Sequence, residues 1–260
     1  MPTLCLTAVA SSEAVREALG RFCENLSEVS GLTVTGLPLG SYAELIDSGA
    51  QPGTDLYWAP PLVAVQLENR NVAVPLVAVT RSTRSSYHSA LFTLSKGALR
   101  TPADMQGVTV AWVSRESASG YFVPRWHLRS LGVSLKQSFS REIFCESHQA
   151  VARAVLDGEA DVGATHVALE PGGSALARAP WLSLGARPSS VRVLLLVGPI
   201  PGDVIAAGQH VPLSTRQRLT AALLSMHDKN AAPAFDARRF EPVPDGHLRL
   251  LKRLYAYADA

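Results

Sequence analysis

The feature that most constrains this chain is a regular alternation, starting at the N-terminus, of short apolar runs with segments whose apolar residues have helical spacing. Residues 3–9 form an apolar run with the composition of a strand. Apolar residues then recur at the three- and four-residue spacing of a helix with one buried face, at Val15, Leu19, Phe22, Leu26 and Val29. Ser11 or Ser12 would cap this helix and Gly31 would end it. A second strand at 32–37 would complete the unit from which largely parallel sheets are built.

The same exchange continues along the rest of the chain. Further strands are expected at 55–58, 72–80, 87–94, 108–113, 142–145, 160–165 and 184–197. Further helices are expected at 42–47, 62–69, 121–131, 149–156, 214–227 and 248–258. Ser214 and Gln217 would form a capping box, and 199–212 would be a loop-rich crossing. This pattern predicts the α/β class with mixed, mostly parallel sheets.

The rhythm of the pattern changes at 81–86, where arginines and hydroxyl residues form a loop. We interpret this change as a passage between two α/β lobes, the second inserted in the first. Lobe 1 would comprise 1–82 and 188–260, and lobe 2 would comprise 83–187. The crossovers near 80–87 and 179–191 would act as hinges.

Composition and charge exclude several classes of protein. Hydrophobic residues make up 47% of the chain and charged residues 18%, which is a globular balance. The net charge of +2 is small and the basic residues are scattered, so a nucleic-acid partner is not expected. No run approaches the roughly 20 apolar residues that span a bilayer, so membrane insertion is not expected either. Cys5, Cys23 and Cys145 lack metal-site spacing and are expected to be small buried residues.

The first residues show neither the basic region nor the apolar region of a signal peptide. The chain is therefore expected to be cytoplasmic if it is complete as written, or periplasmic if a leader has been removed.

Common catalytic motifs are absent from the sequence. It contains no GxxxxGK[ST] loop, no GxGxxG, no HExxH and no GxSxG. A serine and a histidine could still meet in space, because such pairs are defined by geometry. No metal and no organic cofactor is implied, and the sequence favours a binding protein over an enzyme.

Four stretches in register resemble the phosphate, phosphite and phosphonate solute-binding proteins of ABC importers. They are DLYWAPP at 55–61, SSYHSALF at 85–92, VAWV at 110–113 with ESASGYFVPR at 116–125, and SHQAV at 147–151 with LDGEADVGA at 156–164. The resemblance implies a two-lobed type II periplasmic-binding fold with a ligand cleft between the lobes. It also implies that the ligand is a small oxyanion.

The turn at 117–121 precedes a helix, so it offers backbone N–H groups and the positive end of the helix dipole. Ser117 and Ser119 could donate hydroxyl hydrogen bonds, and Gly120 could allow close approach of the backbone. The resemblance assigns Ser117, Ala118, Ser119, Gly120 and Tyr121 to the anion site. The alternative is an ordinary serine cap at the start of a helix.

Three further residues are ligand candidates by the same resemblance. His148 follows Ser147 at another strand-to-helix turn and would add charge or a donor to the anion. Tyr57 and Tyr87 would offer hydroxyl groups and ring faces, whereas Trp58 would alternate into the core. The alternatives are a capping or surface histidine and two core tyrosines.

One residue departs from the family pattern. Ala118 stands where the central motif commonly has threonine, so one side-chain donor is missing. A hydrogen bond to a charged group contributes roughly 1.5–3 kcal/mol, so phosphonate affinity could be about tenfold lower or more. Arg81, Arg84 and Arg115 could compensate from nearby loops. Asp161 could hold a ligand amine or be a structural acid.

The expected function is therefore oxyanion binding, with the protein acting as a monomeric solute-binding component beside an ABC permease. Two alternatives remain open. The first is a cytoplasmic ligand sensor of the same fold that signals to a sensor kinase by lobe closure. The second is a cytoplasmic enzyme on this fold, similar to chorismate dehydratases, in which His148 would be the acid or base.

Overall fold

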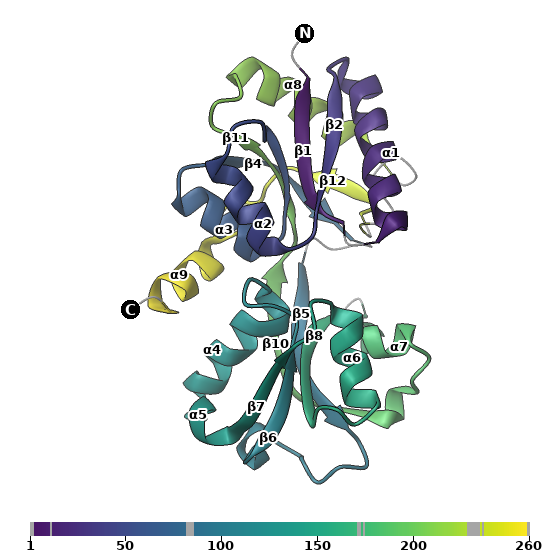
Figure 1. Cartoon of the computed structure of the whole chain (residues 1–260), viewed down its shortest axis with the longest axis vertical. Helices are drawn as coiled ribbons and strands as arrows, with labels where there is room; N and C mark the ends of the chain where they lie inside the picture. Colours follow the sequence, from purple (N-terminus) through teal and green to yellow (C-terminus); the bar gives the residue numbers. More distant parts are fainter. Residues whose placement is uncertain are drawn as a thin grey trace. The chain divides into compact units, whose positions relative to one another are not determined.

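The chain forms two compact units in the computed structural model (Figure 1). Unit 1 comprises Met1–Ser86 and Pro201–Ala260, and unit 2 comprises Tyr87–Ile200. The structure describes residues 3–10, 12–81, 86–170, 173, 175–227, 235 and 237–258, with the backbone alone at 257 and 258. Each unit has its own sheet and its own hydrophobic core.

Unit 1 is built on a mixed six-stranded sheet in the order β12-β4-β11-β3-β1-β2. Its strands are β1 (Leu4–Val9), β2 (Val34–Leu39), β3 (Leu56–Ala59), β4 (Ala73–Thr80), β11 (Val204–Gly208) and β12 (Arg239–Glu241). Its helices are α1 (Glu13–Ser30), α2 (Tyr42–Asp47), α3 (Pro61–Asn69), α8 (Leu213–Ser225) and α9 (Arg249–Ala258), with a 3₁₀ turn at Ser48–Ala50. β1 pairs in parallel with β2 and β3, whereas β11 runs antiparallel between β3 and β4.

The first strand and helix form where their sequence predicts, but Val29, which was predicted on the buried face of the helix, is 46% exposed. Ser12 caps α1 by accepting a hydrogen bond from the Val15 N–H, while Ser11 lies outside the described residues. Gly31 ends the helix in the left-handed region at φ 63°, which glycine adopts at little cost. Leu19, Phe22 and Leu26 of α1 are buried against one face of the sheet, which α8 also covers. The helical spacing of these side chains therefore became one wall of the unit 1 core.

Unit 2 is built on a second sheet in the order β10-β5-β8-β6-β7, with β9 beside β8. Its strands are β5 (Ser86–Leu94), β6 (Val108–Trp112), β7 (Phe139–Phe144), β8 (Val162–Leu169), β9 (Leu176–Arg178) and β10 (Val191–Pro201). Its helices are α4 (Val123–Ser130), α5 (Leu135–Ser138), α6 (His148–Leu156) and α7 (Pro180–Ser183). A π-helical turn, η3 (Ala118–Phe122), leads into α4, and 3₁₀ turns lie at Pro102–Asp104 and Pro188–Ser190.

Helices cover both faces of this sheet (Figure 1), and each face carries its own core. On one face, Phe92 and Val167 pack against α6 and against Trp181 of α7. On the other face, Leu91 and Trp112 pack against Leu128 of α4. A sheet with helices on both faces leaves the carboxyl ends of its parallel strands as the place where polar turns can gather.

The boundaries between the units differ from those that the sequence suggested. The second boundary falls between Ile200 and Pro201 rather than after 187, because β10 is hydrogen-bonded beside β5 in the sheet of unit 2. The first falls between Ser86 and Tyr87 rather than after 82. Most of the predicted hinge at 80–87 cannot be compared, since 82–85 lie outside the described residues.

Two local predictions were wrong. The segment 199–212 contains β11, whose residues are fully or almost fully buried between β3 and β4. A short apolar run that pairs on both sides has no alternating pattern, so the sequence concealed it. The predicted capping box at Ser214 does not form, because α8 begins at Leu213 directly after Pro212.

Within the described residues, no helix combines the length and the apolar character needed to cross a membrane. The same residues contain no group of three potential metal-ligating side chains.

Candidate functional site

The predicted anion-binding turns meet at one edge of the sheet in unit 2. β6 runs parallel to both β7 and β8, so the carboxyl ends of all three strands lie at the same edge. The chain leaves β6 through the turn that begins η3, and it leaves β7 through the turn that begins α6. Ligands of open α/β sheets bind beyond this edge, at the ends of such strands. The fold therefore brings Ser117 and His148, which are far apart in sequence, to a single region.

The turn after β6 presents backbone donors. Ser117 caps the helix, and its Oγ accepts a hydrogen bond of 3.0 Å from the Gly120 N–H. Helical bonding is of the i+5 type here and begins with the Phe122 N–H donating to the Ser117 carbonyl. The N–H groups of Ala118, Ser119 and Tyr121 precede that first bond, one more than in an α-helical start, where the Tyr121 N–H would already be bonded. The π-helical turn thus adds a donor at the positive end of the helix.

The serine side chains of this turn are almost completely buried. Strand β5 holds Ser119 in place, because the hydroxyl of Ser89 in that strand donates a 2.7 Å hydrogen bond to the Ser119 carbonyl. Ser89, Ser117 and Ser119 are all buried. Because the Ser117 Oγ accepts from a backbone N–H, its own hydroxyl proton remains available for another acceptor. The turn is preorganised by the protein itself.

Gly120 is required by packing. A Cβ atom added at this position would lie 2.4 Å from Val113 Cγ2 and 2.8 Å from Ser117 Oγ. The Val113 N–H also donates to the Gly120 carbonyl at 3.1 Å. The approach of a ligand to the backbone at this glycine stays a prediction, and the structure adds that a valine side chain lies where a Cβ atom would be. The glycine lets the turn rest on the end of β6.

His148 is positioned by hydrogen bonds at the start of α6. Ser147 caps this helix by accepting from the Ala150 N–H. The His148 Nδ1 lies 2.9 Å from Thr165 Oγ1 and accepts a long, 3.4 Å hydrogen bond from the His166 N–H. Because a backbone N–H can only donate, Nδ1 is the acceptor and the ring proton is assigned to Nε2. The protonated nitrogen of His148 is therefore Nε2.

Two residues of this region were not singled out by any sequence motif. Thr165 is fully buried and bonds to His148, and His166 contacts the His148 ring with a centroid separation of 4.4 Å. Both lie in the part of β8 that extends past its pairing with β6. A single sequence shows neither how far β8 extends past β6 nor which residues face its open edge. The strand register supplies that information.

Tyr87 lies in the same unit as these groups. It is half-buried at the start of β5, and its ring meets the His166 ring edge-on at 6.4 Å. Tyr87 and Ser89 are two residues apart on one strand, so their side chains share a face of the sheet. The structure therefore brings Tyr87 into the region of Ser119 and His166.

Arg115 and Tyr121 belong to a cluster of arginines and aromatic rings. Arg115 donates to the Tyr121 hydroxyl at 3.1 Å and lies 5.1 Å from the centre of the Phe144 ring. Arg125 lies over the other side of this cluster, 4.7 Å from the Tyr121 ring, and forms an ion pair with Glu142. The Tyr121 side chain is thus engaged by cation–π contacts, and its backbone N–H is the part that belongs to the turn.

Comparisons with known proteins identify the family of the chain. Residues 4–248 match the family described as ABC transporter, phosphonate, periplasmic substrate-binding protein. The chain belongs to that family. A similar solved structure is PhnD1 from Prochlorococcus marinus in complex with methylphosphonate, at 16% identity and a TM-score of 0.79, covering 99% of this chain and 98% of that one.

Two further solved structures show the same fold. XAC2383 from Xanthomonas citri bound to ATP has 20% identity and a TM-score of 0.78, covering 99% of this chain and 98% of that chain. The binding protein component of an ABC phosphonate transporter from Pseudomonas aeruginosa has 18% identity and a TM-score of 0.79, covering 99% and 87%. Together with the family match, they establish the two-lobed α/β fold of periplasmic binding proteins that the sequence predicted.

In this phosphonate-binding family member, Tyr57 is a core residue of unit 1. Its side chain is 1% exposed, and burial, followed by the charge of Asp55, raises its pKa to about 12. The structure buries Tyr57 about as deeply as Ser117 and Ser119, so its contact with the ligand stays a prediction. Trp58 points to the opposite face, as predicted, and packs against Phe22 and Phe240.

Arg81 and Asp161 also have structural partners. Arg81 pairs with Asp203 at 2.5 Å, and the Trp58 indole N–H donates to the same carboxylate at 3.0 Å. Arg84 lies outside the described residues. Asp161 precedes β8 at its amino end, where its carboxylate accepts a 2.8 Å hydrogen bond from the Thr109 N–H. This is the structural role that the sequence left open for Asp161.

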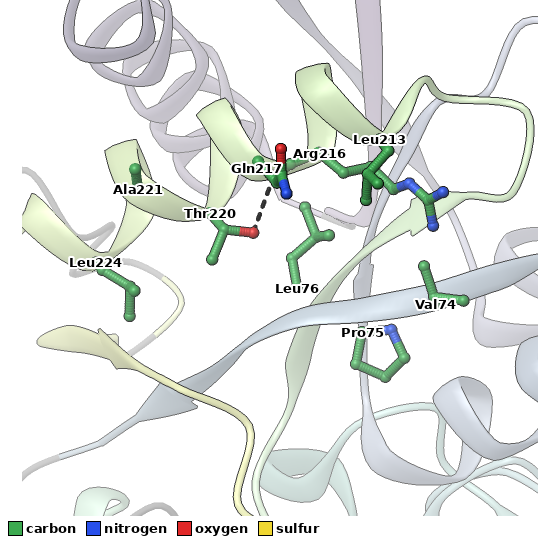
Figure 2. Close-up of a pocket in the computed structure, with 9 residues that line it drawn as sticks. All are labelled: Val74, Pro75, Leu76, Leu213, Arg216, Gln217, Thr220, Ala221 and Leu224. Carbon is green, nitrogen blue, oxygen red and sulfur yellow. Dashed lines mark hydrogen bonds between the residues drawn. The ribbon is translucent and has the colours of Figure 1, made fainter.

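A hollow of about 430 Å³ in unit 1 contains none of the predicted ligand residues (Figure 2). It lies between β4 and α8, where Leu213 and Arg216 of the helix face Pro75 and Leu76 of the strand. Leu76 is an extra residue in its strand, because the pairing with β11 passes from Val77 directly to Pro75. The bulge in β4 lies at this hollow, whose lining residues all belong to unit 1.

Proposed function

We propose that this protein binds a phosphonate, phosphate or phosphite anion at the carboxyl edge of the unit 2 sheet, as the solute-binding component of an ABC importer. One observation carries the proposal. The N-termini of the η3–α4 helix and of α6 follow neighbouring parallel strands, so two positive helix ends and their unpaired donors lie at one edge. Membership of the phosphonate-binding family supports the same ligand class.

The backbone supplies most of the donors in this proposal. The N–H groups of Ala118, Ser119 and Tyr121 would bind the anion oxygens, joined by the Ser117 and Ser119 hydroxyls. Ala118 itself contributes no side-chain donor, but its N–H belongs to the same turn. A π-helical start leaves one N–H more than an α-helical start, which offsets part of the missing threonine hydroxyl.

Two side chains complete the proposed site. The His148 Nε2–H donates to the anion, since Nδ1 is engaged by Thr165 and His166. Tyr87 contributes its hydroxyl from β5. Gly120 has no ligand contact in this proposal and acts by allowing the turn to pack on Val113.

The family context supports a transport role. Proteins of this family are substrate-binding components rather than enzymes, they are periplasmic, and they work with an ABC permease. We infer the same partner, the same compartment and a monomeric state for this chain. The lack of a threonine hydroxyl at Ala118 predicts weaker phosphonate binding, by about tenfold for each hydrogen bond of 1.5 kcal/mol.

The experiment that tests this proposal is a thermal-shift screen followed by isothermal titration calorimetry. The panel contains phosphate, phosphite, methylphosphonate, 2-aminoethylphosphonate, sulfate, ATP and chorismate. A ligand at a thousand times its Kd stabilises the folded state by about 4 kcal/mol, which raises Tm by about 8–16 °C for a chain of this size. A large Tm shift with one phosphorus oxyanion supports the proposal. The absence of a shift with phosphate, phosphite and the phosphonates contradicts it. A response to chorismate alone would favour the enzyme alternative.

A matched pair of variants then tests the position of the site. Ser119→Ala removes one hydroxyl from the turn and should raise Kd for the best ligand by at least about tenfold. Ser130→Ala, at the other end of α4, removes an exposed hydroxyl that bonds only to the His127 carbonyl and should leave Kd unchanged. Equal Kd values for the two variants would mean that the anion binds elsewhere.

A further inference from the structure

His166 occupies an unusual position at the end of the unit 2 sheet. β8 pairs with β6 at Val162 and Gly163 and then continues to Leu169, so its later residues have no partner in β6. The His166 N–H on that side donates instead to the His148 ring, at 3.4 Å. At this edge the His148 ring nitrogen accepts a backbone hydrogen bond that the carbonyl of a neighbouring strand would otherwise accept. This places His166 where the two helix N-termini converge.

The strand register shows which way the His166 side chain points. In the antiparallel pair of β5 and β8, Ser89 lies directly opposite His166. Opposed residues of such a pair share a face of the sheet, with Cβ atoms about 4.5–5.5 Å apart. The Ser89 hydroxyl, on that face, donates to the Ser119 carbonyl at 2.7 Å. The His166 side chain therefore lies beside the turn that holds Ser119.

Aromatic contacts hold the His166 ring in place. It meets the His148 ring at 4.4 Å with an interplanar angle of 83°, and the Tyr87 ring at 6.4 Å with an angle of 90°. Edge-to-face contacts of this kind fix the orientation of the ring. The ring is half-buried, so it is neither a core residue nor a freely moving surface side chain.

We propose that His166 binds the ligand, and that His148 and His166 together select a doubly charged oxyanion over a singly charged one of the same shape. The inference rests on the proposed function, because it needs an oxyanion at the turn of Ser119. Imidazoles are neutral or cationic at physiological pH, so a second negative charge on the ligand favours a cationic ring at His166, beside the neutral ring of His148. A phosphate-type group carries about −1.5 to −2 at pH 7, and a sulfonate carries a single charge.

The test compares methylphosphonate with methanesulfonate, which have the same tetrahedral shape and differ in charge. Calorimetry on the wild-type protein should give a Kd for methylphosphonate at least about tenfold lower than for methanesulfonate. His166→Phe keeps an aromatic ring for the contacts with His148 and Tyr87 and removes both nitrogens. It should raise the methylphosphonate Kd by at least about tenfold and change the methanesulfonate Kd by less than about threefold. His127→Phe on α4 is the matched control and should change neither value.

The outcomes separate this inference from the proposed function. Wild-type protein that binds neither methylphosphonate nor any other phosphorus oxyanion overturns the proposed function, and this inference with it. Wild-type binding that His166→Phe leaves unchanged overturns the inference alone, as does an equal loss for both ligands. If His166→Phe does not fold by circular dichroism, His166→Gln replaces it and keeps a neutral donor. His166→Gln should lower the preference for methylphosphonate, and an unchanged preference overturns the inference.

Discussion

The contact between Gly120 and Val113 gives a prediction whose size can be worked from the structure. In Gly120→Ala, the new Cβ would start 2.4 Å from Val113 Cγ2 and 2.7 Å from Val113 Cβ. Carbon atoms pack at about 3.5–4.0 Å, so the turn or the valine must move by about 1 Å. Overpacking of this kind costs about 1–3 kcal/mol, and Val113 is β-branched and 1% exposed, which favours the upper end. Alanine recovers up to about 1 kcal/mol through its helix propensity.

The net loss of unfolding free energy in Gly120→Ala is therefore expected to be about 2 kcal/mol. Val113→Ala removes two buried methyl groups and should lose about 2 kcal/mol by itself. In the double variant the alanine Cβ at 120 fills the space that Val113 leaves. The double variant should then lose about 2 kcal/mol rather than about 4, a coupling of about 2 kcal/mol between the two positions.

Urea denaturation, monitored by tryptophan fluorescence, measures the unfolding free energies of the two single variants and the double variant, since Trp112 lies at the end of β6 next to Val113. The methylphosphonate Kd should follow the same pattern, weaker in Gly120→Ala and partly restored in the double variant. Additive losses would show that the two side-chain positions do not meet. If Gly120→Ala left the unfolding free energy unchanged but raised Kd, the glycine would act by allowing the ligand contact that the sequence suggested.

Four other outcomes follow from the structure. Arg81→Met should lower the free energy of unfolding by about 3 kcal/mol, because it leaves the buried Asp203 carboxylate without its ion-pair partner. Adding Asp203→Asn should restore most of this loss, which thermal unfolding measures. Burial raises the pKa of all three thiols, that of Cys23 to about 12, so a thiol reagent at pH 8 should react slowly until the protein unfolds, and a fast native reaction of Cys23 would contradict this. The pKa of Tyr57 is raised above its unfolded value to about 12, so the stability that it contributes is complete below about pH 10 and lost towards pH 12. Tyr57→Phe should therefore flatten the plot of unfolding free energy against pH between these values. An unchanged slope of that plot would refute the prediction. His148→Ala should raise the methylphosphonate Kd by about tenfold to a hundredfold in calorimetry, and an unchanged Kd would remove His148 from the site.

Several parts of the candidate site could be predicted from the sequence because they depend on short-range order. Ser117 and Ser147 each precede a helix and follow an apolar run, and both proved to be caps. The strand-to-helix turn is a local event of a few residues, and serine is favoured at its cap wherever it occurs. The family motifs at 116–125 and 147–151 added the expectation that the two turns serve one ligand.

Other parts of the site depended on pairings that connect distant residues. β11 inserts between β3 and β4, more than a hundred residues away in the chain, so its burial could not be read from its own sequence. Tyr57 was predicted to offer its hydroxyl group to the ligand, and in the fold of unit 1 it is 1% exposed. Whether an aromatic residue is a wall of a core or a surface for a ligand depends on which elements pack over it.

The sequence by itself therefore determined the α/β class, the serine cap of the first helix and the family, because periodicity, turn chemistry and motifs are properties of consecutive residues. Only the tertiary structure decided that β10 belongs to unit 2, that Gly120 packs on Val113, and that His166 lies beside Ser119. Each of these depends on strand order or register. A shift of one residue in register reverses every side chain of a strand, and no single stretch of sequence carries that information.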